Sequence, residues 1–183
     1  MENLEEKLVR REEIFGGTVL HVVRDTVLLP NGKEAIREIS LHNGAVAIIP
    51  VLPNGKILME RQYRYAHGRV FLEIPAGKLD YVGEDPEEAA KRELREETGA
   101  LAGKITFLGQ IDTAPALISE KIQLYLAEEL TFGERELDED EFLALEEISI
   151  DDLVDMVMSG EIKDSKTQIA ILKYDKIRRG LSQ

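Results

Sequence analysis

EDPEEAAKRELREETG, residues 84–99, is the stretch that decides the fold, because it predicts one helix with a defined start and end. Asp85 is a good N-cap residue, and the proline that follows it suits the first helical position, where its missing N–H costs nothing. Glu88, three residues after the cap, completes a capping-box pattern. Gly99 supplies the left-handed residue that commonly ends a helix. We therefore predict a helix over residues 86–98.

This helix places carboxylates on the side that should pack against the protein. At about 100° per residue, Glu93 and Glu97 fall between the small apolar residues, and Glu96 lies on their flank. Soluble helices normally keep charges off the packing face, because clustered carboxylates repel one another and resist desolvation. Arg92 alone cannot easily neutralise three of them. Mg²⁺ or Mn²⁺, which prefer carboxylate oxygens, would do so.

The competing interpretation is an ordinary surface helix whose charges pair along one face. Glu87 with Lys91, and Glu88 with Arg92, have the i, i+4 spacing of ion pairs on exposed helices. The charge pattern alone favours neither interpretation over the other.

The whole chain limits what kind of protein this is. Its 183 residues suit one domain plus a small appendage, and 43% hydrophobic residues can form a core. The absence of cysteine excludes disulfides, thiolate metal sites and cysteine nucleophiles. A net charge of −13 disfavours nucleic acid and anionic membranes as partners, unless metal cations intervene. With no membrane-length apolar run and no secretory signal, we expect a cytoplasmic protein.

Two PNG turn signals organise the first half of the chain. The first joins predicted strands 17–29 and 33–41, giving a small antiparallel N-terminal β-sheet region over residues 1–43. The second joins strands 45–52 and 56–63 as another hairpin. This hairpin begins the larger region, residues 44–183. The other elements predicted in that region are strands 71–74, 104–111 and 121–127, an acidic loop 131–141, and helices 151–159 and 165–179. Mixed strands and helices indicate an α/β fold in which helices cover a mixed sheet.

The predicted helix and the loop before it resemble the Nudix box: Gly77, Glu84, Arg92-Glu93-Leu94, Glu96-Glu97 and Gly99. The loop from Gly77 to Glu84 is one residue longer than the family pattern. The resemblance implies the Nudix fold, a mixed β-sheet sandwiched between helices. It also implies hydrolysis of a nucleoside diphosphate linked to another group.

The resemblance assigns roles to the residues of this motif. Glu93, Glu96 and Glu97, with the backbone carbonyl of Ala76, would hold Mg²⁺, for which Mn²⁺ could substitute. Glu97 and Arg92 would be catalytic, and Arg92 would act by orienting the metal ligands.

Further features resemble the ADP-ribose pyrophosphatase branch of that family. They are LEIPAGK at 72–78, DEDEF at 138–142, Pro115 sixteen residues beyond Gly99, and the N-terminal sheet, which in this branch helps to build an intertwined homodimer. In the acidic loop, Glu139 would be the general base and Glu141 an extra metal ligand, although the order of the two stays open. A solvated acidic loop with neither role is the alternative.

Four residues outside the motif are candidates for substrate binding by resemblance: Arg37, Glu38, Arg64 and Pro115. Arg64 would contact a phosphate or ribose, and Arg37 with Glu38 would recognise adenine. The alternative for Arg64 is a plain surface arginine. Phe15 and Tyr63 are candidates to stack on the base.

The sequence therefore predicts a Mg²⁺-dependent enzyme that cleaves ADP-ribose to AMP and ribose 5-phosphate. Its partner would be a small nucleoside diphosphate sugar, with no nucleic acid and no membrane. The alternatives are the same chemistry on another nucleoside diphosphate sugar or a nucleoside triphosphate, and a non-catalytic domain that binds ADP-ribose as a regulator. Three intact glutamates argue against the regulator, since a pure binder has little need of a crowded carboxylate cluster.

Overall fold

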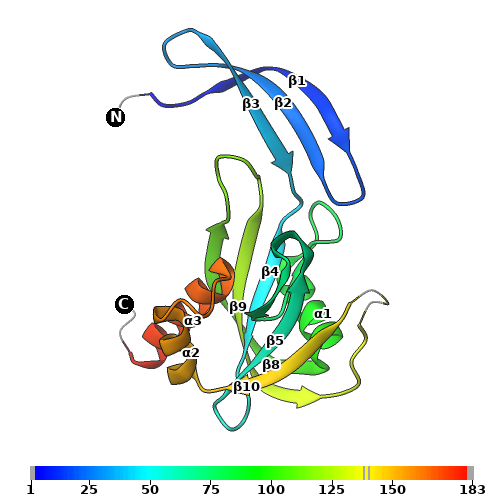
Figure 1. The fold of residues 1–183 in the computed structure, drawn as a ribbon, viewed down its shortest axis with the longest axis vertical. Coiled ribbons are helices and arrows are strands. Elements are labelled where there is room, and N and C mark those ends of the chain that lie inside the picture. Colours follow the sequence, from blue (N-terminus) through cyan, green and yellow to red (C-terminus); the bar gives the residue numbers. More distant parts are fainter. Residues whose placement is uncertain (1–2, 138, 140, 181–183) are drawn as a thin grey trace.

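The computed structural model describes residues 3–137, 139 and 141–180, and its strands form three sheets (Figure 1). The N-terminal sheet is antiparallel and consists of β1 (Lys7–Gly16), β2 (His21–Leu28) and β3 (Glu34–Leu41). It projects from the other sheets in Figure 1 and meets the segment between β8 and β9 at the bridge Ser40–Ile118. The second has the order β10-β5-β6 and consists of β5 (Ile57–Arg64), β6 (Arg69–Glu73) and β10 (Leu143–Ile148).

The third sheet has the order β7-β4-β9-β8 and is mixed, because β4 pairs in parallel with β9 and antiparallel with β7. Its strands are β4 (Ala45–Pro50), β7 (Ala76–Lys78), β8 (Ala100–Asp112) and β9 (Lys121–Phe132). The helices are a 3₁₀ turn η1 (Tyr65–His67), α1 (Pro86–Thr98), α2 (Ile150–Met158) and α3 (Ser165–Arg178). None of the described helices is long and apolar enough to cross a membrane.

Two buried clusters lie on opposite sides of the strands. One joins β4, β5, β6 and β9 to α2 and α3, and the other places Ala89, Ala90 and Leu94 of α1 against Val46, Ile48 and the opposite faces of the same strands. The sheets are therefore sandwiched between α1 on one side and α2 with α3 on the other (Figure 1). This confirms the predicted α/β fold.

Helix α1 begins and ends where the sequence predicts. The Asp85 side chain accepts a hydrogen bond from the Glu87 N–H at 2.9 Å, and the Gly99 N–H donates to the Arg95 carbonyl at 2.8 Å with φ of +73° at the glycine. The capping-box partner Glu88 instead binds Lys91 at 2.8 Å. The cap therefore rests on Asp85, Pro86 and Gly99.

Four strand predictions need correction, one of them being that residues 76–78, predicted as part of a loop, form β7. The predicted hairpin of 45–52 with 56–63 is wrong: β4 and β5 belong to different sheets and share only the isolated bridge Val51–Ile57 among the described pairings. All six residues of β4 are buried, because β4 is a central strand with partners on both edges. Strands β1 and β10 were not predicted at all. Strand β1 is exposed along its whole length, so its sequence lacks the alternation that indicates a half-buried strand.

Candidate active site

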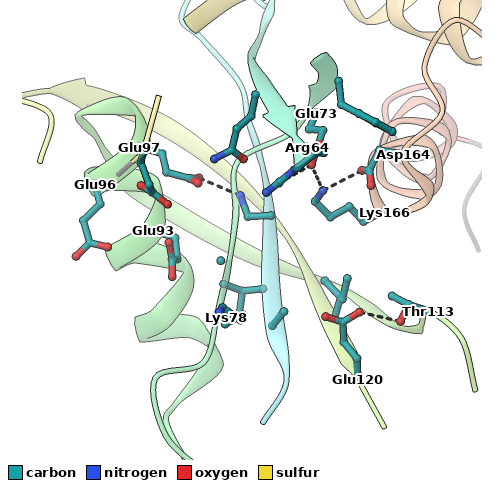
Figure 2. A pocket seen from close by; sticks show the side chains of 18 of the residues that line it. Arg64, Glu73, Lys78, Glu93, Glu96, Glu97, Thr113, Glu120, Asp164 and Lys166 are labelled. Atoms are coloured by element: carbon teal, nitrogen blue, oxygen red, sulfur yellow. Dashed lines mark hydrogen bonds and ion pairs between the residues drawn. The ribbon is translucent and has the colours of Figure 1, made fainter. Parts of the chain in front are cut away.

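A cavity of about 940 Å³ lies between α1 and the start of α3. Figure 2 shows Glu93, Glu96 and Glu97 on one side of it, and Arg64, Glu73, Asp164 and Lys166 on the other. Thr113 and Glu120, whose side chains bond each other at 2.7 Å, form a third side. A volume near the upper end of the usual range for ligand pockets suits a ligand as large as a nucleotide sugar.

Glu97 is the most deeply buried carboxylate of α1, with only 3% of the residue exposed. It accepts a hydrogen bond from the Ala76 backbone N–H at 3.0 Å. Burial raises its pKa far above the ordinary value, and the charges of Glu60 and Glu93 raise it further. A cation bound at this position would offset the burial and the neighbouring charges that raise this pKa.

Glu93 lies against the backbone of β7. A Cβ atom built on Gly77 would overlap the Glu93 carboxylate, so the glycine makes room for the side chain. Burial raises the pKa of Glu93 to about 7, although the Arg92 guanidinium lowers it in part. Glycine is needed at position 77 because a side chain there would occupy the place of the Glu93 carboxylate, and not because of its backbone φ angle.

Arg92 lies among the acidic residues of the motif. It donates hydrogen bonds to Glu93 at 2.9 Å, to Glu96 at 3.1 Å and to Glu84 at 3.4 Å. The longer loop ahead of the helix still brings Glu84 to Arg92, where Glu84 also accepts from the Asp80 N–H at 2.6 Å. Arg92 therefore holds three carboxylates in place.

The opposite face of α1 behaves as the surface-helix interpretation predicts. Lys91 pairs with both Glu87 and Glu88 at 2.8 Å, and all three side chains are exposed. The two interpretations thus describe two faces of one helix, and the expected Glu88–Arg92 pair is replaced by bonds from Arg92 to the inner carboxylates.

The donor set fits a hard divalent cation, because it consists of carboxylate oxygens and can add the Ala76 carbonyl. No group of three or more acidic or histidine side chains already converges on a metal position among the described residues. Glu93 and Glu96 are instead paired with Arg92, and Glu97 accepts from the Ala76 N–H. Glu60 is buried with neither oxygen hydrogen-bonded. The room that Gly77 leaves beside Glu93 and the unbonded carboxylate of Glu60 both support the fit.

The acidic loop brings one of its two candidate glutamates to the cavity. Glu141 lies on the cavity wall, and its charge raises the pKa values of Glu93 and Glu97. Glu139 is exposed at a turn and is not among the residues that line the cavity. The motif residues at 138 and 140 lie outside the described part of the chain.

Arg64 is part of a buried charge network rather than a plain surface residue. It binds Glu73 through two hydrogen bonds, at 2.9 and 2.8 Å, and the ammonium group of Lys166 also donates to Glu73. Lys166 pairs in turn with Asp164 at 3.1 Å. Arg64 keeps 38% of its side chain exposed on the cavity wall, so it can contact a ligand while Glu73 fixes its orientation.

Three other candidates do not line the cavity of this single chain: Arg37, Glu38 and Pro115. Arg37 binds Glu6 in the N-terminal sheet, and Glu38 pairs with Arg24 at 2.9 Å. Sequence reasoning in turn missed Glu60, Glu73, Glu120 and Lys166. Each looks like an ordinary surface residue in its segment. Only the tertiary fold brings Glu73, Glu120 and Lys166 to the cavity wall and buries Glu60 opposite Glu73 on the adjacent strand.

The raised pKa values predict how stability depends on pH without metal. Glu93, with a pKa of about 7 in place of 4.5, stabilises the fold in its protonated form, and this contribution is lost as pH rises through about 7. Glu97, whose pKa burial raises to about 10, acts in the same direction, and its contribution is lost as pH rises through about 10. We expect the melting temperature of the EDTA-treated protein to fall as pH rises from about 5 to 8. Saturating Mg²⁺ should flatten that fall, and a metal-free melting temperature that climbs over the same range would contradict the assignment.

In this α/β sandwich a glutamate-rich helix lines a cavity beside the glycine-containing strand β7, and this arrangement is that of the Nudix class. The NUDIX domain family model matches residues 41–168, and the chain therefore belongs to the Nudix family. Over 183 residues it is 45% identical to the ADP-ribose pyrophosphatase of Bacillus subtilis, which covers 99% of this chain and 98% of that protein.

Two further relatives widen the comparison. The chain is 44% identical over 169 residues to the methanol dehydrogenase activator of Bacillus methanolicus, covering 91% of each chain. It is 36% identical over 177 residues to the ADP-ribose pyrophosphatase of Mycobacterium tuberculosis, covering 96% of this chain and 86% of that one. The crystal structure of an ADP compounds hydrolase has the same fold, with a TM-score of 0.87 over 98% of both chains at 24% identity.

Proposed function

We propose that this protein hydrolyses the pyrophosphate bond of ADP-ribose to give AMP and ribose 5-phosphate, with Mg²⁺ as its cofactor. The observation that carries the proposal is the set of glutamates on α1, Glu93, Glu96 and Glu97, which lines a cavity large enough for a nucleotide sugar. The names of the relatives from Bacillus subtilis and Mycobacterium tuberculosis point to the same substrate. Another nucleoside diphosphate sugar is the second candidate, since GDP-mannose pyrophosphatases of Yersinia are 31–33% identical over 154 residues.

The α1 glutamates, with the Ala76 carbonyl, would hold the metal, which when bound neutralises pyrophosphate oxygens and stabilises the charge that develops as water attacks phosphorus. Arg92 keeps the carboxylates oriented before the cation arrives. From the opposite wall, Arg64, fixed by Glu73, presents its remaining N–H groups to the phosphates. Oxygen from water is added to phosphorus, and the bond to the bridging oxygen breaks.

A base must come within hydrogen-bond reach of the attacking water. The place of Glu141 on the cavity wall favours it for a role close to the metal, as a ligand or as the base. Glu139, exposed two residues earlier, could reach the water only after the loop moves.

We also propose a cytoplasmic homodimer built on the N-terminal sheet. The sheet exposes several large apolar side chains in a single chain, among them Leu8, Val9, Ile14, Phe15 and Ile36. An exposed apolar surface of this kind suits a protein partner. A second copy packed there would carry its own Arg37 and Glu38 along with its sheet, which accounts for two adenine-binding candidates that do not reach the cavity of their own chain.

Product analysis tests the reaction. The full-length protein with ADP-ribose and Mg²⁺ should release AMP and ribose 5-phosphate in equal amounts, and excess EDTA should abolish the release. Product formation that continues unchanged in EDTA would contradict the metal assignment. Formation of ADP in place of AMP would show that a different bond is cleaved.

A further inference from the structure

Glu60 is a buried acidic residue to which neither the motif nor the family comparison gives a role. It lies on β5 with 0% of its surface exposed, and neither carboxylate oxygen has a hydrogen-bond partner among the described residues. Buried polar groups are normally hydrogen-bonded, and buried charges are normally paired. Among the described residues, Glu60 therefore lacks the partner that a buried carboxylate normally has.

Strand alternation fixes the direction of the Glu60 side chain. Gln62 and Arg64, two and four residues further along β5, line the cavity, so Glu60 lies on the same face. Glu73, directly opposite Glu60 on β6, also lines the cavity. Leu58, two residues earlier, packs in the cluster that contains Leu94 of α1. Glu60 thus points to the same side of β5 as Gln62 and Arg64, buried behind the residues that line the cavity and next to the core beneath α1.

The neighbours of Glu60 are the acidic groups of the proposed metal site. Its charge acts on Glu97, and those of Glu73 and Glu141 act on Glu60 itself. The two nearby cations are already engaged, because Arg64 binds Glu73 through two hydrogen bonds and Lys166 binds Glu73 and Asp164. Neither of these two cations forms a direct bond with Glu60 in the described structure.

A purely structural role does not explain this arrangement. A glutamine could donate a hydrogen bond at the same position, and a methionine would fill the same space without a charge to desolvate. Functional sites often keep a carboxylate that lowers the stability of the metal-free protein, because the carboxylate contributes to binding.

We propose that Glu60 is a further carboxylate of the divalent-metal site, bound to the cation directly or through one coordinated water. The inference rests on the proposed function, because it requires the cation that Glu93, Glu96 and Glu97 would hold. It would add a carboxylate from β5 to the carboxylates of α1 and the Ala76 carbonyl of β7.

The test is a Mn²⁺ titration of the full-length, EDTA-stripped protein without substrate, followed by electron paramagnetic resonance of the free ion. Glu60→Gln should weaken Mn²⁺ binding at least about tenfold, within the range seen when metal-supporting groups are changed. Its metal-free melting temperature should equal or exceed that of the wild type. The matched control is Glu146→Gln, which removes an exposed carboxylate on the neighbouring strand β10 and should bind Mn²⁺ as the wild type does.

Each outcome decides a different statement. Equal Mn²⁺ affinities for Glu60→Gln and the wild type would overturn the role of Glu60 while leaving the metal site intact. A wild type that binds no Mn²⁺ would overturn the metal site of the proposed function and this inference with it. If Glu60→Gln does not fold, the titration is repeated on Glu60→Met; failure of both variants to fold would show a structural role and overturn the inference.

Discussion

Glu97→Gln is expected to release AMP from ADP-ribose at least about 100-fold more slowly than the wild type at saturating Mg²⁺, because a direct metal ligand should matter no less than the groups that orient ligands. Glu97 is nearly fully buried in the last turn of α1, near Glu93 and Glu60. The amide keeps the size of the side chain and loses the charge that the cation requires. The measurement is kcat from initial rates of AMP release.

The stability of the same variant separates a functional defect from misfolding. Because burial raises the pKa of Glu97, replacing it with a neutral amide should leave the metal-free melting temperature equal or higher. Glu88→Gln, on the outward face of the same helix, is the matched control and should keep wild-type activity. Near-normal kcat for Glu97→Gln would contradict the metal assignment.

Gly77→Ala is expected to lower kcat/KM to a similar extent, roughly 100-fold, by displacing a ligand that it does not replace. The new methyl group would overlap the Glu93 carboxylate, which must then leave the β7 backbone. The φ angle of Gly77 is not in the left-handed region, so the backbone itself accepts alanine. Mn²⁺ affinity measured alongside should fall together with the rate.

Gly133→Ala is the control for this substitution. Gly133 also has an ordinary φ angle, and the atom nearest to an added Cβ is the Gly99 carbonyl oxygen at 4.0 Å. This variant should keep both activity and Mn²⁺ affinity. A Gly77→Ala enzyme with the activity of its control would show that the position of Glu93 against β7 is not needed.

The sequence predicts α1 and its inward carboxylates because the relevant signals are local. Caps, helical periodicity and motif spacing all lie between Gly77 and Gly99. The same reasoning found β4 but gave it the wrong partner, because the PNG turn suggested a hairpin with β5. The continuous apolar run AVAIIP was the better signal, since it is typical of a strand buried on both faces.

Apart from Arg64, the acidic and basic residues opposite α1 could not be predicted in this way. Glu60 and Glu73 become neighbours only through the register of β5 with β6, and Lys166 joins them from the other end of the chain. In sequence, each is one charged residue in a mixed segment. Arg37 and Glu38 are the opposite case: they were predicted from sequence, but they do not line the cavity of their own chain. Arg37 binds Glu6, and Glu38 binds Arg24.

The central claim is that the cavity and its carboxylates serve the hydrolysis of ADP-ribose. The most direct test compares kcat/KM for ADP-ribose, GDP-mannose, other nucleoside diphosphate sugars and deoxynucleoside triphosphates at one Mg²⁺ concentration, with full-length protein. We predict that ADP-ribose ranks among the best substrates and yields AMP. A value for ADP-ribose well below that of another member of the panel would contradict the account.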